Sequence, residues 1–394
     1  MEGFGCSNLP SKNDKRPLAV VSGTGYGELM KTSLPSFSKP KFKFLRVCRI
    51  SAFGLMMAGG CLHAADLPTA SNVQGVKDYL LGMLSKMDAA TDDFAKKSAE
   101  YQALIDEKYK GDYAAALKGD RDKILSLVKA MRDDYQAADS FGYERVEGIV
   151  AGVDKLSDFD VYLDSGVPKD KASKDTPAAP TTFKLKNGTV IEGEGCTFTY
   201  LVEPTLWGKN KKHIVPVEVG GDGTHAAKDS LPEADFIAAA GADMDAKMDE
   251  LVKASKGWEP TAEDCFHAVV TMTPTLSGYF DDWKDSRYNK EKSGLFTSVS
   301  RVSDMQGIME SVSLTYDAVD SSVKPKDAAL SKTIKGGFAD IMAFIEKVGA
   351  REKKGTVTVA EIEELHDQAQ AKADKLVPQV EQAAALVGVK VSTN

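Results

Sequence analysis

Most of the chain between residues 72 and 386 alternates apolar and polar positions with the period of an α-helix. In residues 72–110 the apolar side chains recur mostly at steps of three, four and seven, and Lys, Asp and Glu fill the positions between them. This spacing gathers the apolar side chains on one face and predicts a long amphipathic helix. The same pattern predicts further helices at residues 119–139, 143–150, 233–255, 261–286, 298–321, 326–348 and 359–386.

Two local signals refine the helix predicted at residues 261–286. Thr261 followed by Asp264 resembles a capping box, in which each side chain bonds the backbone of the other residue. Pro274 lies inside the pattern, but the apolar spacing continues past it to Trp283. Proline removes one backbone donor and crowds the preceding turn, so we expect a kink there and not an end.

The middle of the chain is not helical. Residues 165–180 are rich in Lys, Asp, Pro and Ala, which is typical of a solvent-exposed loop. Residues 182–193 contain two alternating runs joined at Asn187-Gly188, which predicts a β-hairpin. Residues 209–232 carry a Gly cluster and show no regular pattern. We therefore predict an all-α fold, in which two groups of antiparallel helices flank a loop and β-hairpin insertion.

The predicted domain organisation has four parts. Residues 1–64 are an over-extended N-terminus plus a signal peptide, and residues 65–165 are a first helical lobe. Residues 166–232 are the insertion, and residues 233–394 are a second helical lobe. A repeat of short period is not found, which argues against a solenoid.

The signal-peptide prediction rests on the residues that follow Met30, which we take as the true start. This stretch is rich in Lys and Arg, an apolar run at 50–62 follows, and small residues end it at Ala64-Ala65. The apolar run is too short to span a bilayer and has the layout of a secretory signal. We expect export to the periplasm as a soluble protein, and attachment as a lipoprotein at Cys61 is the alternative. The sequence after it offers no segment long and apolar enough for a membrane span.

The composition is that of a globular protein, with 42% hydrophobic and 27% charged residues. Residues 1–64 hold nine of the basic residues and three of the acidic ones, so the formal charge falls from −8 to −14 without them. Such an acidic protein is a poor binder of nucleic acid or of anionic membranes. The charge suits cationic partners, and solubility alone is the other explanation.

Cys196 and Cys265 are the two cysteines that remain after processing. An oxidising compartment permits a disulfide between them, but two cysteines do not make a disulfide framework. Both lie in apolar surroundings, so two buried free thiols are the alternative.

A single acidic residue, Glu203, lies in the apolar stretch TFTYLVEPTLWG at residues 197–208. A buried carboxylate is costly unless it has a partner, so we expect a hydrogen-bond donor, a cation such as Arg287, or a metal beside it. Tyr200 precedes Glu203 by three residues, so on an α-helix the two share a face. Tyr200 is alternatively a core aromatic residue.

The stretch that ends Glu203-Pro-Thr-Leu-Trp-Gly208 resembles the signature of the imelysin-like family, which includes EfeO-type periplasmic iron-uptake proteins. The family motif is His-x-x-Glu followed by x-x-Leu-Trp-Gly, and Tyr200 lies where that histidine would be. Residues 76–94, 276–289 and 300–319 also resemble helices of the family.

The resemblance implies two four-helix-bundle-like lobes with a cleft between them, in which the motif binds a metal ion. It also implies an uptake role, with a membrane iron permease or another uptake component as partner. Tyrosinate and carboxylate ligands suit ferric iron better than an imidazole site does. A tyrosine at this position therefore indicates either a metal site adapted to a harder cation or a metal site that has been lost.

Other acidic residues are candidate metal ligands beside Tyr200 and Glu203. Glu144 and Glu147 lie three apart and share a helical face, which makes them a candidate second half-site. Asp282 lies in an acidic run next to Trp283. An exposed charged helix face is the alternative for all three.

Three functions fit these observations. The first is a non-enzymatic periplasmic protein that captures a metal ion, with iron as the leading candidate. The second is a metal-dependent peptidase, a label that the family has carried, but the chain lacks a His-Glu-x-x-His motif and any other zinc-ligand pair with a general base. The third is a glycan-binding protein that stacks sugars on Trp207, Trp258 or Trp283.

Overall fold

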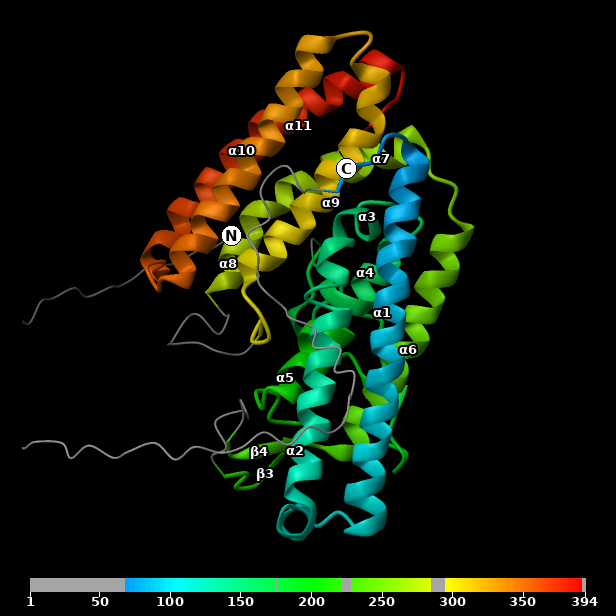
Figure 1. The fold of residues 1–394 in the computed structure, drawn as a ribbon, viewed down its shortest axis with the longest axis vertical. Coiled ribbons are helices and arrows are strands. Elements are labelled where there is room, and N and C mark those ends of the chain that lie inside the picture. The colour runs from blue at the N-terminus through cyan, green and yellow to red at the C-terminus, as the bar shows by residue number, and fades with distance from the viewer. Residues whose placement is uncertain (1–67, 175, 221–227, 285–294, 392–394) are drawn as a thin grey trace, which may run out of the picture. The chain divides into compact units, whose positions relative to one another are not determined.

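The computed structural model describes residues 68–174, 176–220, 228–284 and 295–391. Residues 1–64, which include the predicted signal segment, and Arg287 lie outside these ranges. The described part is mainly helical, as predicted, with two small antiparallel strand pairs (Figure 1).

The longer helices follow the predicted ranges closely. They are α1 (Val73–Gln102), α2 (Tyr113–Ala138), α6 (Ala234–Gly257), α7 (Ala262–Met272), α8 (Leu276–Trp283), α9 (Arg301–Val323), α10 (Ala328–Lys353) and α11 (Ile362–Val387). Three helices of a single turn are α3 (Glu147–Val150), α4 (Ser157–Asp160) and α5 (Glu203–Leu206). Short 3₁₀ or π-helical turns are η2 (Ala103–Lys108), η3 (Tyr143–Arg145), η4 (Val161–Ser165), η5 (Lys169–Lys171), η6 (Thr197–Val202), η7 (Thr273–Thr275) and η8 (Val359–Glu361).

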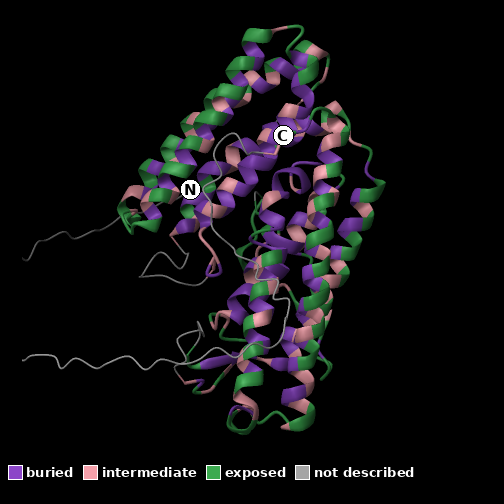
Figure 2. Cartoon of the chain, viewed as in Figure 1, coloured by how far each residue is buried: buried purple, intermediate pink, exposed green. Residues whose placement is uncertain are grey.

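The helices pack in two groups around apolar faces. In the first group α1 packs along both α2 and α6, and in the second group α9 packs on α7 and α10 while α11 packs on α8 and α10 (Figure 1). Helix α9 also contacts α1, α3 and η3, and so it joins the two groups. Its faces are buried nearly all round (Figure 2).

The packing of α6 bears on the predicted lobes, whose boundaries at residues 165 and 232 remain predictions. Sequence order alone places α6 in the second lobe, whereas its apolar face, which includes Met244, Met248 and Leu251, packs on α1. Sequence position therefore does not fix which group a helix joins, because the choice depends on which apolar faces complement each other.

The predicted hairpin is confirmed, and a second strand pair accompanies it. Strands β1 (Thr182–Lys184) and β2 (Val190–Glu192) pair antiparallel, and Gly188 between them has a φ of 94°, a conformation that favours glycine. Strands β3 (Ile214–Pro216) and β4 (Ser230–Pro232) also pair antiparallel. They lie in the segment predicted to be irregular, because strands of three residues are too short to show an alternating pattern.

Of the two local signals in the predicted 261–286 helix, the capping box is confirmed, and at Pro274 a 3₁₀ turn divides the predicted helix in two. Thr261 accepts a hydrogen bond from the Asp264 N–H, and Asp264 accepts one from the Thr261 N–H, which completes the capping box at the start of α7. Pro274 lies in the 3₁₀ turn η7, which separates α7 from α8. The missing backbone donor is accommodated by this tighter turn.

A glycine sets the distance between α3 and α9. A Cβ added to Gly148 would lie 2.4 Å from Ser311 Oγ and 2.7 Å from Val312 Cγ2, which is too close. We therefore expect Gly148→Ala to lower the free energy of unfolding by about 1–3 kcal/mol, because the two helices must separate. Chemical denaturation measures the change.

The matched control is Gly82→Ala on the exposed face of α1, where no atom lies within 4 Å of the added Cβ. There the substitution should raise the free energy of unfolding by about 0.5–1 kcal/mol, because alanine suits a helix interior better than glycine. Equal stabilisation by both substitutions would show that α3 and α9 are not held at this distance.

Candidate functional site

Five buried carboxylates line one small cavity between the two helix groups. The cavity has a volume of about 10 Å³, which is room for about one water-sized species. We call it the acidic cavity and define it by its five acidic residues, Asp139, Glu144, Asp164, Glu203 and Asp304. All five are less than 8% exposed.

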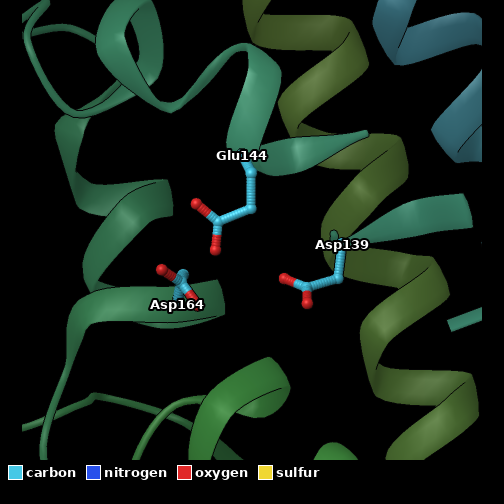
Figure 3. A group of neighbouring side chains, drawn as sticks. All are labelled: Asp139, Glu144 and Asp164. Carbon is cyan, nitrogen blue, oxygen red and sulfur yellow. The ribbon is translucent and has the colours of Figure 1, made fainter. Parts of the chain in front are cut away.

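Distant parts of the chain supply these side chains. Asp139 is the C-cap residue of α2, and its N–H donates to Tyr135 O. A tight turn then leads to Glu144 on η3, and the Glu144 N–H donates to Asp139 O. Asp164 lies on η4, and Asp304 lies in the first turn of α9. Figure 3 shows the side chains of Asp139, Glu144 and Asp164 pointing toward one another. One carboxylate oxygen from each of these three lies within 4.8 Å of the others.

Among the described residues, one buried cation, Arg301, pairs with this cluster. Its Nη1 donates to Glu144 Oε1 at 3.0 Å and to Asp304 Oδ2 at 3.4 Å. The guanidinium carbon also lies 4.4 Å from the ring centroid of Tyr279 and 4.3 Å from that of Phe296. The aromatic rings hold the guanidinium in place, since they attract a cation over their faces.

Three oxygens of the cluster have no compensating partner among the described residues. Asp139 Oδ1, Glu144 Oε2 and Asp304 Oδ1 are buried and have no hydrogen-bond partner among the described residues. Burial raises the pKa of Asp139 and of Glu144 well above the ordinary carboxyl range, and it raises the pKa of Asp304 to about 7. An ionised carboxylate in such a place needs a proton or a cation to offset its lost hydration.

Backbone N–H groups are the hydrogen-bond partners of the buried Glu203 carboxylate. Its Oε1 accepts the Ser298 N–H at 2.7 Å, and the backbone of Phe296 and Thr297 also bonds its carboxylate. Burial raises the pKa of Glu203 to about 7, and these backbone donors oppose that rise. Glu203 therefore lines the cavity and also fixes the segment that leads into Arg301.

Tyr200 does not line the acidic cavity. It is half-buried, and the Lys171 Nζ lies 5.4 Å from its ring centroid. The reason is local: Thr197–Val202 forms the π-helical turn η6, whose wider turn moves residues three apart off a shared face. The neighbouring Thr199 faces the cavity instead, where its hydroxyl donates to Asp164 Oδ1 at 2.6 Å.

The other two predicted ligands lie beside the cavity. Glu147 on α3 is buried, and its Oε1 accepts the Tyr279 hydroxyl at 2.6 Å. The Asp282 side chain is 44% exposed and accepts from Arg301 Nη2 at 3.4 Å. Of the five predicted ligands, the structure thus brings Glu144 and Glu203 together in the cavity, and it places Glu147, Tyr200 and Asp282 outside it.

Sequence reasoning missed Asp139, Asp160, Asp164 and Asp304. A signal existed for two of them, since Asp160 and Asp164 lie four apart in the apolar run FDVYLD, which repeats the situation of Glu203. Asp139 and Asp304 occur in ordinary polar helix ends, where an acidic residue carries no information about a site.

The two cysteines that the structure describes form no disulfide, and the two buried tryptophans are core residues. Cys196 and Cys265 are both buried free thiols, and the Cys196 thiol donates to Asp164 O at 2.6 Å. Trp258 and Trp283 are each 3% exposed, so neither presents a ring to a sugar. Trp207 is half-buried and lies under Arg132. The described helices include none that is both long and apolar enough to cross a membrane.

Comparison with known families supports the resemblance found in the sequence. The family model described as Imelysin matches residues 199–387, a span that includes Glu203, Arg301 and Asp304. This part of the chain is therefore similar to the Imelysin family. The match begins after Asp139, Glu144 and Asp164. No curated protein matches the chain.

Proposed function

We propose that this imelysin-like protein captures a hard metal cation, iron in the first place, in the acidic cavity and hands it to a membrane uptake partner. The observation that carries the proposal is the convergence of Asp139, Glu144 and Asp164 with buried oxygens that lack partners among the described residues. A cation placed between these oxygens would supply the missing compensation.

The geometry and the donor set both fit such a cation. Oxygens on opposite sides of a hard cation, each at about 2.0–2.6 Å, lie about 4–5 Å apart, and the three carboxylate oxygens lie within 4.8 Å of one another. Carboxylate ligands without imidazole or thiolate favour hard cations such as Fe³⁺, Mn²⁺, Ca²⁺ and Mg²⁺. Asp139, Glu144 and Asp164 carry three negative charges when ionised, which matches the charge of a ferric ion, and Arg301 pairs with both Glu144 and Asp304.

The uptake role rests on different support. The signal pattern that follows Met30, the acidic charge and the family assignment all suit an exported protein that meets metal ions outside the cytoplasm. A membrane permease or another uptake component is the partner that this role requires.

Ferric titration of the purified, chelator-stripped full chain tests the cation site. We expect the wild-type protein to bind Fe³⁺ supplied as a weak chelate, and Asp139→Asn or Glu144→Gln to bind it at least about tenfold more weakly, because each removes a ligand charge. The matched controls Tyr200→Phe and Asp282→Asn should bind like the wild-type protein, since neither side chain lines the cavity.

Visible absorbance during the same titration separates the two views of Tyr200. A tyrosinate charge-transfer band that disappears in Tyr200→Phe would place the ion at Tyr200 and contradict the acidic-cavity site. Absence of binding in the wild-type protein would contradict capture altogether. Peptide hydrolysis that a chelator abolishes would favour the peptidase alternative instead.

A further inference from the structure

A second carboxylate group adjoins the acidic cavity and shares one residue with it. One oxygen each from Glu147 on α3, Asp160 at the end of α4 and Asp164 on η4 lie within 4.8 Å of one another. All three residues are less than 8% exposed. Asp164 thus belongs both to this group and to the one it forms with Asp139 and Glu144.

Neutral hydroxyl groups orient this second group. The Tyr279 hydroxyl donates to Glu147 Oε1 at 2.6 Å, and the Tyr143 hydroxyl donates to Asp160 Oδ1 at 2.8 Å. A hydroxyl fixes the direction of a carboxylate but does not neutralise its charge. Fixed carboxylates in a low-dielectric interior are the kind of ligand that a cation requires.

A separate observation points to a missing ligand. Glu147 Oε2 is fully buried, and within the described ranges it has no hydrogen-bond partner. The described residues also provide no ion pair to Glu147, Asp160 or Asp164, whereas Arg301 pairs with Glu144 and Asp304 on the other side. The second group is therefore the less compensated of the two.

The total charge of the region supports the same reading. Seven buried carboxyl groups lie together here: Asp139, Glu144, Glu147, Asp160, Asp164, Glu203 and Asp304. Arg301 and one captured cation leave several of these charges without compensation, and a second cation beside Glu147 would reduce that excess.

We propose that the site holds two hard cations, the second bound by Glu147 and Asp160, with the Asp164 carboxylate bridging both. This inference rests on the proposed capture of the first cation at Asp139 and Glu144. Paired sites of this kind place two cations about 3.5–4 Å apart, so that a shared carboxylate reaches each of them. Thr199, by donating to Asp164 Oδ1, positions the bridge.

Equilibrium dialysis of the stripped full chain against Mn²⁺, followed by elemental analysis, counts the ions. We expect two equivalents in the wild-type protein, one in Asp160→Asn, one in Asp139→Asn, and a loss of both high-affinity ions in Asp164→Asn. Asparagine keeps the shape of aspartate and still accepts the Tyr143 hydroxyl, so Asp160→Asn should remain folded by circular dichroism. Asp158→Asn, an exposed change on the same helix, should keep two equivalents.

Electron paramagnetic resonance of the Mn²⁺-loaded protein supplies a second readout. Two ions bridged by Asp164 should give an exchange-coupled spectrum, which Asp160→Asn converts to that of an isolated ion. One equivalent in the wild-type protein would overturn the second site and leave the proposed capture intact, whereas zero equivalents would contradict both. Loss of both ions in folded Asp160→Asn would also overturn a separate second site.

Discussion

Replacing Arg301 with methionine is expected to lower the free energy of unfolding of the metal-free protein by about 3–5 kcal/mol at pH 8. The guanidinium is 5% exposed and is the cation that bonds both Glu144 and Asp304. Methionine fills much of the volume but leaves those carboxylates buried without a charge partner, which is the costly way to break a buried ion pair. Denaturant titration with metal-free protein measures the loss.

Two comparisons make the Arg301 result specific. Arg351→Met removes a guanidinium that pairs with Glu361, where both side chains are 34% exposed, so it should cost no more than about 1 kcal/mol. A saturating hard cation should recover part of the Arg301→Met loss, since it binds only the folded state. Equal, small losses for both variants would show that the buried carboxylates do not depend on Arg301.

The metal-free protein is expected to become less stable as the pH rises from 5 to 8. Burial raises the pKa of Asp160 to about 6, of Glu203 and Asp304 to about 7, and of Glu147 to about 8. These values exceed those of the unfolded chain, so folding favours the protonated groups, and their contribution is lost as the pH passes through the folded-state values. Since one pKa unit corresponds to about 1.4 kcal/mol, the loss should be about 3 kcal/mol or more.

Thermal unfolding in metal-free buffer across this pH range tests the prediction. Glu147→Gln should flatten the profile between pH 6 and 8, because glutamine cannot ionise there. A hard cation should raise the stability more at pH 8 than at pH 5, because more of the carboxylates are ionised there and fewer protons must be released on binding. A stability that rises from pH 5 to pH 8 in the metal-free protein would show that these carboxylates are ionised and well paired in the fold.

The sequence by itself determined the helices and the β1–β2 hairpin. The amphipathic repeat, the Thr261–Asp264 capping box and the Asn187-Gly188 turn are local signals, and each has the expected structure. A helix or a tight turn is encoded by residues a few positions apart, so a pattern in the sequence is enough to predict it. The sequence also marked Glu203 as a buried carboxylate in need of a partner.

The tertiary structure decided which acidic residues meet in the acidic cavity. Asp139, Glu144, Asp164 and Asp304 come together because α9 packs on η3 and α3, contacts that depend on complementary apolar faces far apart in the chain. The π-helical turn η6 turned Tyr200 away from the cavity, and backbone N–H groups became the partner of Glu203. Spacing along the chain carries no record of such contacts, since they arise only once the helices have packed.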